Sequence, residues 1–371
     1  MRVLVLPRDP NPYQSLLYGE MQRLGVQVTY IGELTASQTV NLLLLPLEVV
    51  VRRVAGARLI HLHWVFGFTL PGARRFLVMR RVAHFWFLVW LRTCRMVGMR
   101  LVWTAHNVLP HEAVFADDVS ARRALVEASH LVLAHSQLAL AELAAFGAVA
   151  RKNAVVQHGP IAPILSPAPL RTPGAGDGPP RFLFFGRVQE YKGVDDLLTA
   201  FLAMPDDIAA HLTVAGQCDD PRLRSRLYAL ARRGGARVVL RLERVPSEEV
   251  AQLLAAADVV VLPFRRVTTS GSAMLALSHG RPLIAPDLAG LADLPEEAVL
   301  RYDGGVPGLI AALVHLARAD GETLAAMSAA ARGYASRTTW QEIAERTMIE
   351  MVSVLGDAPQ AGACGQLARA P

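Results

Sequence analysis

Three residues that can bind an anion lie close together in the stretch FLFFGRVQEYKG, residues 182 to 193. The run FLFF has the composition of a strand, and Gly186 allows the tight turn that would follow it. Arg187 and Lys192 can then converge on the first turn of a helix, where backbone N–H groups favour a phosphate. Because the only other lysine is Lys152, a compact point charge is indicated at Lys192. The same residues also fit a surface turn with two solvated cations, and this stretch alone leaves both interpretations open.

A second stretch, RRVTTSGSAMLALSHG at 265–280, follows the buried run DVVVLPF and leads into a predicted helix. Hydroxyls and backbone N–H groups gather at the start of that helix, on Thr269, Ser270, Gly271 and Ser272. The positive end of the helix dipole lies at the same place, so an anion is favoured there too. A plain serine N-cap explains the same residues, and both interpretations can hold together. Two anion sites in one domain suit a diphosphate.

Histidines follow two apolar runs in the first half, in HLHWVFG at 61–67 and TAHNVLPHE at 104–112. They could form a metal cluster, but no acidic ligands accompany them at fixed helical spacing, so hydrogen-bonded histidines at strand ends are favoured. No D-x-D triplet is present for a metal-bound diphosphate. We therefore expect no metal and no cofactor, with basic side chains and helix ends neutralising a bound diphosphate. The four histidines concerned are His61, His63, His106 and His111.

Short β-rich runs alternate with longer segments of helical period along the chain, which is the pattern of parallel sheets covered by helices. Six such runs occur before residue 160: RVLVLP, VQVTYI, RLIHLHW, RLVWTAH, LVLAHS and NAVVQH. Five more occur after residue 180: RFLFFG, AHLTVAG, ARVVLRLE, DVVVLPF and RPLIAPD. The predicted fold class is α/β, with two doubly wound, Rossmann-like domains and a deep cleft between them. Ligands are expected beyond the carboxyl ends of the strands.

Residues 160–180 hold seven prolines and no apolar periodicity, which predicts a semi-rigid linker. We expect a first domain at 1–160, a linker at 161–180 and a second domain at 181–335. The segment 338–356 begins with TTWQEIAERTMIEMV and predicts a final helix that crosses back to the first domain. The tail, 357–371, is expected to be disordered.

Composition excludes several classes of protein. Apolar residues make up 52% and charged residues 19%, which argues against disorder. Three widely spaced cysteines offer neither a disulfide framework nor a zinc pattern, and no apolar run is long enough to span a membrane. The N-terminal apolar run is too short for a signal peptide, so a cytoplasmic location is expected.

The second half resembles the donor domain of GT-B glycosyltransferases, especially the family 4-like group, in which a G-R-x(4)-K-G stretch follows the first strand. Gly186, Arg187, Lys192 and Gly193 match it. The resemblance implies that Arg187 and Lys192 hold the diphosphate of a nucleotide sugar. VAG at 214–216 and ERVPSEEVAQLLAAADVVVLPF at 243–264 resemble the nucleotide-binding strands, so the loop at Arg244 and Val245 would face the base.

The chain departs from this family at one element. Its members usually carry two glutamates in an E-x(7)-E element near the donor sugar, whereas alignment on Gly280 places Val267 and Leu275 there. Ser270 and Ser272 would then take over part of that role. Whether the anomeric configuration is retained or inverted stays open.

The first half resembles the acceptor domain of the same family, with His106 matching its strand-end histidine. The resemblance implies sugar contact or transition-state support for His106. If the reaction inverts, a general base is needed within reach of the acceptor hydroxyl, and Glu112 is preferred over Asp9 and His111. A carboxylate at the start of a helix explains Glu112 equally. The predicted acceptor-binding residues are Asn11, Tyr13, His63, Trp64 and His111; an Asn-Pro turn before a helix is the alternative for Asn11.

Residues 49–111 contain ten arginines and no Asp or Glu, which predicts a basic face. On a helix covering 74–97 a stripe forms from Arg74, Arg81, Arg92 and Arg95, with Phe85 and Leu88 among them. The remaining aromatic side chains fall mostly opposite: Phe76, Trp86, Phe87 and Trp90. The pattern is typical of a helix on an anionic membrane surface, or of a helix that packs its aromatic side on the sheet and solvates its arginines. No nucleic-acid-binding motif is present, so no nucleic acid partner is expected.

The sequence therefore predicts a glycosyltransferase that moves a sugar from a GDP- or UDP-sugar to a hydroxyl of a glycan or lipid-linked acceptor. Bacterial cell-surface polysaccharide or glycolipid synthesis is the favoured setting. The enzyme would be cytoplasmic, with a peripheral position on the inner face of the plasma membrane as an option. The alternatives are a tailoring enzyme for a small natural product and a GT-B-like nucleotide-sugar epimerase or binding protein.

Overall fold

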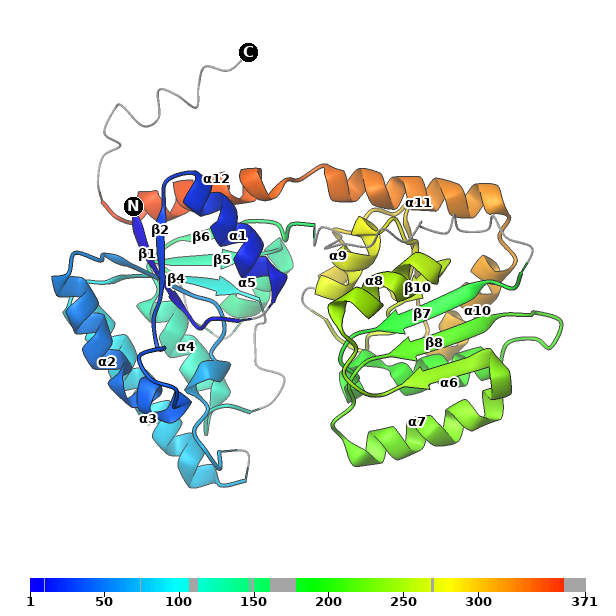
Figure 1. The fold of residues 1–371 in the computed structure, drawn as a ribbon, viewed down its shortest axis with the longest axis horizontal. Coiled ribbons are helices and arrows are strands. Elements are labelled where there is room, and N and C mark those ends of the chain that lie inside the picture. Colours follow the sequence, from blue (N-terminus) through cyan, green and yellow to red (C-terminus); the bar gives the residue numbers. More distant parts are fainter. Residues whose placement is uncertain are drawn as a thin grey trace, which may run out of the picture. The chain divides into compact units, whose positions relative to one another are not determined.

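The computed structural model describes residues 1–9, 11–73, 75–106, 113–145, 147, 150–160, 178–267 and 270–356. Two compact units share the chain (Figure 1). The first consists of Met1–His158 together with the C-terminal segment that starts at Trp340. The second is Gly159–Thr339. Most of the predicted linker and all of the predicted tail, 161–177 and 357–371, lie outside the described residues.

The first unit is built on a parallel sheet of six strands in the order β2-β1-β3-β4-β5-β6. The strands are β1 (Arg2–Leu6), β2 (Gln27–Tyr30), β3 (Leu59–Leu62), β4 (Arg100–Ala105), β5 (Leu131–Ala134) and β6 (Asn153–Val155). The helices are α1 (Pro12–Arg23), α2 (Gln38–Val54), α3 (Leu77–Met96), α4 (Asp118–Ala128), α5 (Gln137–Ala144) and α12 (Trp340–Ser353), with a short 3-10 helix η1 (Phe66–Phe68).

Alternation along β1 divides the core of this unit into two layers. Successive strand residues point to opposite faces, so Val3 and Val5 join one apolar cluster while Leu4 and Leu6 join the other. The cluster around Val3 and Val5 is closed by α1 and α12, which contact each other. The opposite cluster is closed by α2, α3 and α4 (Figure 1).

The second unit repeats the design with the strand order β12-β11-β10-β7-β8-β9. Its strands are β7 (Arg181–Phe185), β8 (His211–Ala215), β9 (Val238–Arg241), β10 (Val259–Val261), β11 (Leu283–Pro286) and β12 (Val299–Tyr302). Its helices are α6 (Val194–Leu202), α7 (Pro221–Gly234), α8 (Ser247–Ala256), α9 (Gly271–Ser278), α10 (Val306–Ala317) and α11 (Gly321–Ser336), with 3-10 turns η2 (Glu190–Lys192), η3 (Gly235–Arg237) and η4 (Ala289–Leu291).

The predicted α/β class with two doubly wound units is confirmed, since both sheets are parallel and every run predicted as a strand forms one. The strand β12 was not predicted. It lies at the sheet edge and most of its side chains are only half-buried, so its apolar signal is weak. In each parallel sheet the carboxyl ends of all strands meet at one edge, where ligands of such folds bind.

Helix α3 follows the predicted basic helix with one correction. Phe87 and Trp90 are buried, whereas Arg81, Arg92 and Arg95 are exposed together with Phe85. Trp86 is half-buried and donates from Nε1 to the carbonyl of Leu42 at 2.8 Å. Phe76, expected among the core-facing aromatics, is 53% exposed, because the helix begins at Leu77 and Phe76 precedes its first turn. Arg74 lies outside the described residues.

Candidate functional site

The turn after β7 brings together residues from two distant parts of the second unit. Gly186 has φ +109°, and its N–H donates to the carbonyl of Ala215 at 3.0 Å. A Cβ built on Gly186 would lie 3.2 Å from Ser272 Oγ and 3.5 Å from Lys192 Nζ. A lysine ammonium and a serine hydroxyl therefore meet at the carboxyl end of β7, as expected for a shared anion site.

Lys192 is the cation at this strand end. Burial, with a contribution from Arg187, lowers the pKa of its ammonium to about 8. In the described part of the chain no carboxylate forms an ion pair with it, and its Nζ lies 5.5 Å from the centroid of the Phe264 ring. A partly desolvated ammonium without a counter-ion gains more from an incoming anion than a solvated one.

Helix α9 supplies the second half of the site. Ser270 is its N-cap and accepts from the N–H of Ala273 at 3.1 Å, as in the N-cap interpretation of the sequence. Gly271 and Ser272 occupy the first turn, whose N–H groups have no partners within a helix. The helix dipole adds partial positive charge at the same point. Thr269 lies outside the described residues.

Two other arginines near this edge are already engaged with carboxylates. Arg187 pairs with Asp219 at 2.6 Å, and both side chains are about half exposed. Arg265 is held by Asp195, Asp196 and Glu190 at 2.8–3.3 Å. An anion at α9 would therefore meet Lys192 as its uncompensated partner, and Arg187 only in competition with Asp219.

The remaining predicted donor residues lie further along the sheet. Arg244 is exposed and Val245 half-buried in the loop between β9 and α8, and β8 separates β9 from β7. No described contact joins this loop to Lys192. Val267 and Leu275, which the sequence comparison on Gly280 predicts at the positions of the family glutamates, pack against the apolar core of the second unit.

In the first unit the strand-end histidines form one continuous hydrogen-bonded chain. Tyr18 of α1 bonds His61 Nδ1 at 2.7 Å and His63 Nε2 at 2.6 Å. His63 Nδ1 and His106 Nε2 are 2.9 Å apart, and His106 Nδ1 and His135 Nε2 are 3.1 Å apart. At one end Thr104 Oγ1 is hydrogen-bonded to His61 Nε2 at 2.7 Å. At the other end the Val156 carbonyl is hydrogen-bonded to His135 Nδ1 at 2.9 Å. We call this the histidine chain: Thr104, His61, Tyr18, His63, His106 and His135.

The carbonyl at one end fixes every proton in the histidine chain. Burial and the neighbouring histidines keep the pKa values of the four imidazoles low, at about 3 for His61 and His135, so all are neutral near pH 7. The Val156 carbonyl can only accept, so His135 donates from Nδ1 and accepts at Nε2. His106 must then donate from Nδ1, and the same logic runs back to Thr104. Each imidazole is thus the Nδ1–H tautomer, with both nitrogens used.

This arrangement limits what the predicted first-unit residues can do. Tyr13 and His63, predicted to bind the acceptor, are 2% exposed and lie among other aromatic rings. His106 is 8% exposed, and both of its ring nitrogens are occupied. Trp64 stacks on His106 with centroids 4.3 Å apart and remains half-buried. Within the described ranges no group of three or more His, Cys, Asp or Glu side chains is arranged to hold a metal.

The predicted bases are only partly described. Glu112 and His111 lie outside the described residues. Asp9 follows β1, its Oδ1 accepts from the N–H of Asn11 at 2.8 Å, and partial burial raises its pKa. Asn11 is exposed and caps α1, as in the Asn-Pro interpretation.

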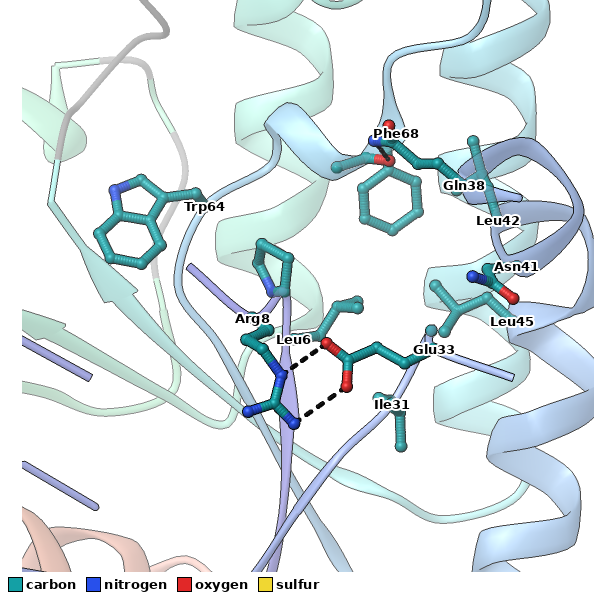
Figure 2. A pocket seen from close by; sticks show the side chains of 13 residues that line it. Leu6, Arg8, Ile31, Glu33, Gln38, Asn41, Leu42, Leu45, Trp64 and Phe68 are labelled. Atoms are coloured by element: carbon teal, nitrogen blue, oxygen red, sulfur yellow. Dashed lines mark hydrogen bonds and ion pairs between the residues drawn. The ribbon is translucent and has the colours of Figure 1, made fainter. Parts of the chain in front are cut away.

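A pocket of about 300 Å³ lies at the ends of β1 and β2, next to α2 and η1 (Figure 2). Arg8 and Glu33 form its polar side, joined by two hydrogen bonds of 2.8 and 3.0 Å. Sequence reasoning missed this pocket, since its walls come from four separate segments of the chain.

Residues 179–319 match the family model described as glycosyl transferases group 1. The predicted resemblance is therefore confirmed over most of the second unit. A relative from Xanthomonas campestris pv. campestris, named GDP-mannose:glycolipid 4-beta-D-mannosyltransferase, is 33% identical over 191 residues. That alignment covers 48% of this chain, and it spans about half the length of the relative, 51%.

Solved structures of the same fold cover almost the whole chain. Sucrose-phosphate synthase from Thermosynechococcus elongatus has a TM-score of 0.73 at 17% identity and covers 96% of this chain and 99% of its own. The Anabaena protein Alr3699/HepE in complex with UDP-glucose has a TM-score of 0.68 at 17% identity and covers 95% and 100%. The chain has the GT-B fold, with two α/β units.

Proposed function

We propose that this protein is a glycosyltransferase that takes a sugar from a nucleotide diphosphate sugar and transfers it to a hydroxyl group. The observation that carries the proposal is the meeting of Gly186, Lys192 and Ser272 at the carboxyl end of β7, beside the first turn of α9. The family match over residues 179–319 supports it.

The leaving nucleoside diphosphate gains negative charge as the glycosidic bond to it breaks. The ammonium of Lys192 and the N–H groups of α9 are preorganised at one point and stabilise that charge. Arg187 adds a second cation when the diphosphate displaces Asp219. These groups need no divalent metal, so we expect the transfer rate to survive a chelator; loss of activity in chelator would contradict this part of the proposal.

The donor is tested first with GDP-mannose and UDP-glucose. The first is in the name of the Xanthomonas relative, and the second is bound in the Anabaena structure. The same relative acts, by its name, on a glycolipid, so a lipid-linked acceptor is proposed here. For an inverting reaction Glu112 stays the proposed base, and Asp9, which follows β1, is the second candidate because its carboxyl has a raised pKa. Of E112Q and D9N, the variant of the true base loses about a hundredfold or more in kcat.

Thermal-shift measurements test donor binding. A bound nucleotide sugar raises the unfolding temperature by mass action, and K192M should abolish that shift. The matched control is K152M, since Lys152 pairs with Glu350 in the first unit and plays no part at the donor site. A full shift in K192M, or none in the wild-type protein with any GDP- or UDP-sugar, would overturn the donor site.

A peripheral position on an anionic membrane is proposed from the surface of the first unit. Nineteen large apolar side chains are exposed in the described ranges, and thirteen of them lie between Leu34 and Met96, on or next to α2 and α3. Arginines accompany them, and this segment contains no acidic residue after Glu48. None of the helices in the described ranges combines the length and apolar character needed to cross a bilayer.

Sedimentation with phosphatidylglycerol vesicles, compared with phosphatidylcholine vesicles, tests this surface. Binding is expected only to the anionic vesicles and should weaken with salt. L47S and F85S, at positions 61% and 64% exposed, should weaken it, while I349S, at a position 65% exposed on α12, should not. Equal loss in all three variants, or no binding at low salt, would remove the membrane proposal.

One observation favours a second candidate function. Val267 and Leu275, the predicted counterparts of the family glutamates, are apolar, and both pack against the core. A nucleotide-sugar-binding protein without catalysis would tolerate this. Formation of a glycosylated product with any acceptor excludes it.

A further inference from the structure

The pocket beside β1 and β2 combines two different walls (Figure 2). One wall is apolar and consists of Ile31, Leu42, Leu45 and Phe68. The other carries the Arg8–Glu33 pair, and the exposed amide of Gln38 adds to it from α2. Asn41 also lines this side, but it is buried and its amide is bonded to Thr35. Its volume is about 300 Å³, enough for a small polar ligand with one apolar face.

The two charged side chains of the polar wall contact each other, and both are exposed. The Arg8 guanidinium lies 3.8 Å from the centroid of the Tyr30 ring. It also donates one hydrogen bond to each carboxylate oxygen of Glu33. Two of its five N–H groups face Glu33, which leaves three for other acceptors. The Glu33 oxygens keep lone pairs that can accept from a hydroxyl.

The charges of this wall cancel, and that decides the class of ligand. The carboxylate of Glu33 would repel an anion as strongly as Arg8 attracts it, so the net electrostatic attraction for a phosphate is small. A sugar ring fits both walls, because its hydroxyls need paired donors and acceptors while its C–H face packs on apolar side chains.

We propose that this pocket binds a neutral sugar ring of the acceptor, with hydroxyls on Arg8 and Glu33 and a C–H face on Leu42, Leu45 and Phe68. The inference rests on the proposed function and adds to it the acceptor class and its place. Asp9 directly follows Arg8, so the ring lies next to a candidate base. Helix α2 also exposes Leu43 and Leu47, which places the lipid of a glycolipid acceptor on the adjoining surface.

Direct binding is tested with octyl glycosides of glucose, galactose and mannose below their micelle concentrations. The protein carries 5-fluorotryptophan, and the fluorine resonance of Trp64, which lines the pocket, is assigned from W64F. At least one glycoside should shift this resonance at about tenfold lower concentration than 1-octanol or octyl phosphate. Octanol acting equally well identifies an alkyl pocket, octyl phosphate acting better identifies an anion site, and no shift at all removes the pocket; each overturns the proposal.

Kinetics test the same site through variants that spare the donor unit. Gln38 is exposed, and its one hydrogen bond, to Gly67, is 3.5 Å long, so Q38W should fold while its indole fills the pocket. The acceptor KM should rise about tenfold with the donor KM unchanged. The matched control is Q22W, at an exposed position on α1.

A second pair of variants tests the polar wall. E33Q removes the charge that balances Arg8, whereas E20Q removes the similar exposed pair with Arg23 on α1. Only E33Q should raise the acceptor KM. If the wild-type protein transfers sugar and both Q38W and E33Q keep its acceptor KM, the pocket proposal is refuted while the proposed function stands. A wild-type protein that neither transfers sugar nor responds to any donor refutes the proposed function, and the glycoside titration still decides the pocket.

Discussion

At the scale of single residues, the donor site depends on the protonation of Lys192. Its side chain is partly removed from water, and Arg187 lies near enough to disfavour a second positive charge. Both effects destabilise the ammonium, so its pKa falls to about 8. A bound diphosphate stabilises the ammonium form of Lys192, because only the charged form attracts it.

This pKa predicts that donor affinity depends on pH. Below about pH 8 Lys192 is protonated and binding is at full strength. Above that value each binding event must also take up a proton, so Kd should rise by up to about tenfold per pH unit. Calorimetric titration of GDP or UDP between about pH 7 and about pH 9.5 measures this dependence.

The variant K192R separates charge from geometry. A guanidinium stays protonated across this range, so the arginine variant should bind more weakly than the wild type at neutral pH but without the alkaline loss. A wild-type Kd that stays constant through this pH range would show that Lys192 does not meet the phosphates.

At the scale of elements, the junction between η2 and α6 holds Lys192 in place. Gly193 ends η2 and caps α6 with φ +64°. A Cβ at this position would lie 2.0 Å from the carbonyl oxygen of Pro263, in the loop after β10. Two loops of the second unit therefore approach each other as closely as a glycine allows.

We predict that G193A destabilises the second unit more than backbone strain alone would. Gly304 is the control, because it has φ +77° and no atom within 4 Å of a built Cβ. G304A should cost about 1 kcal/mol, and G193A about 3 kcal/mol or more, because strain and overlap add. Urea unfolding of both variants measures the difference. Equal losses would mean that the Pro263 loop moves aside freely.

The elements themselves were largely predictable from the sequence. Each apolar run of strand length that was predicted as a strand forms one. The turn at Gly186 was predicted because glycine adopts positive φ, and its φ is +109°. The predictions missed one whole strand, β12, and misplaced the start of one helix, α3. The half-buried edge strand β12 lacks a full apolar run, and Phe76 precedes the helix whose periodicity was extended to it.

At the scale of the whole molecule, the site was only half predictable. The types and spacing of its residues predict the anion site from the sequence. Gly186, Lys192 and Ser272 were predicted in this way, and the structure places them together. The histidine chain needs Tyr18 and His135 as well, and neither stands out without the register of β3, β4 and β5. The pocket was missed because Arg8, Glu33 and Leu45 come from three separate segments.

The histidine chain makes the first unit more sensitive than the second to unfolding at acid pH. All four of its histidines belong to the first unit, and each has a pKa held below the ordinary value of 6.5. In the unfolded chain they titrate near 6.5, so between about pH 3 and 6.5 the unfolded state binds more protons. Stability from these groups is complete above about pH 6.5 and is lost as the pH falls. One unit below that value, four histidines together account for at most about 6 kcal/mol.

The first unit should therefore unfold before the second at mildly acid pH. All five tryptophans, Trp64, Trp86, Trp90, Trp103 and Trp340, lie in the first unit, so indole fluorescence follows that unit alone while circular dichroism follows both. Near pH 7.5 we expect the two melting curves to lie close together, and near pH 5.5 the fluorescence transition should move to lower temperature. H61Q should flatten the pH dependence of the fluorescence transition, since it removes one buried imidazole, whereas H211Q, at an exposed histidine of the second unit, should not. If the fluorescence transition moves with pH no more than the dichroism does, burial does not hold the four imidazoles neutral in the folded unit.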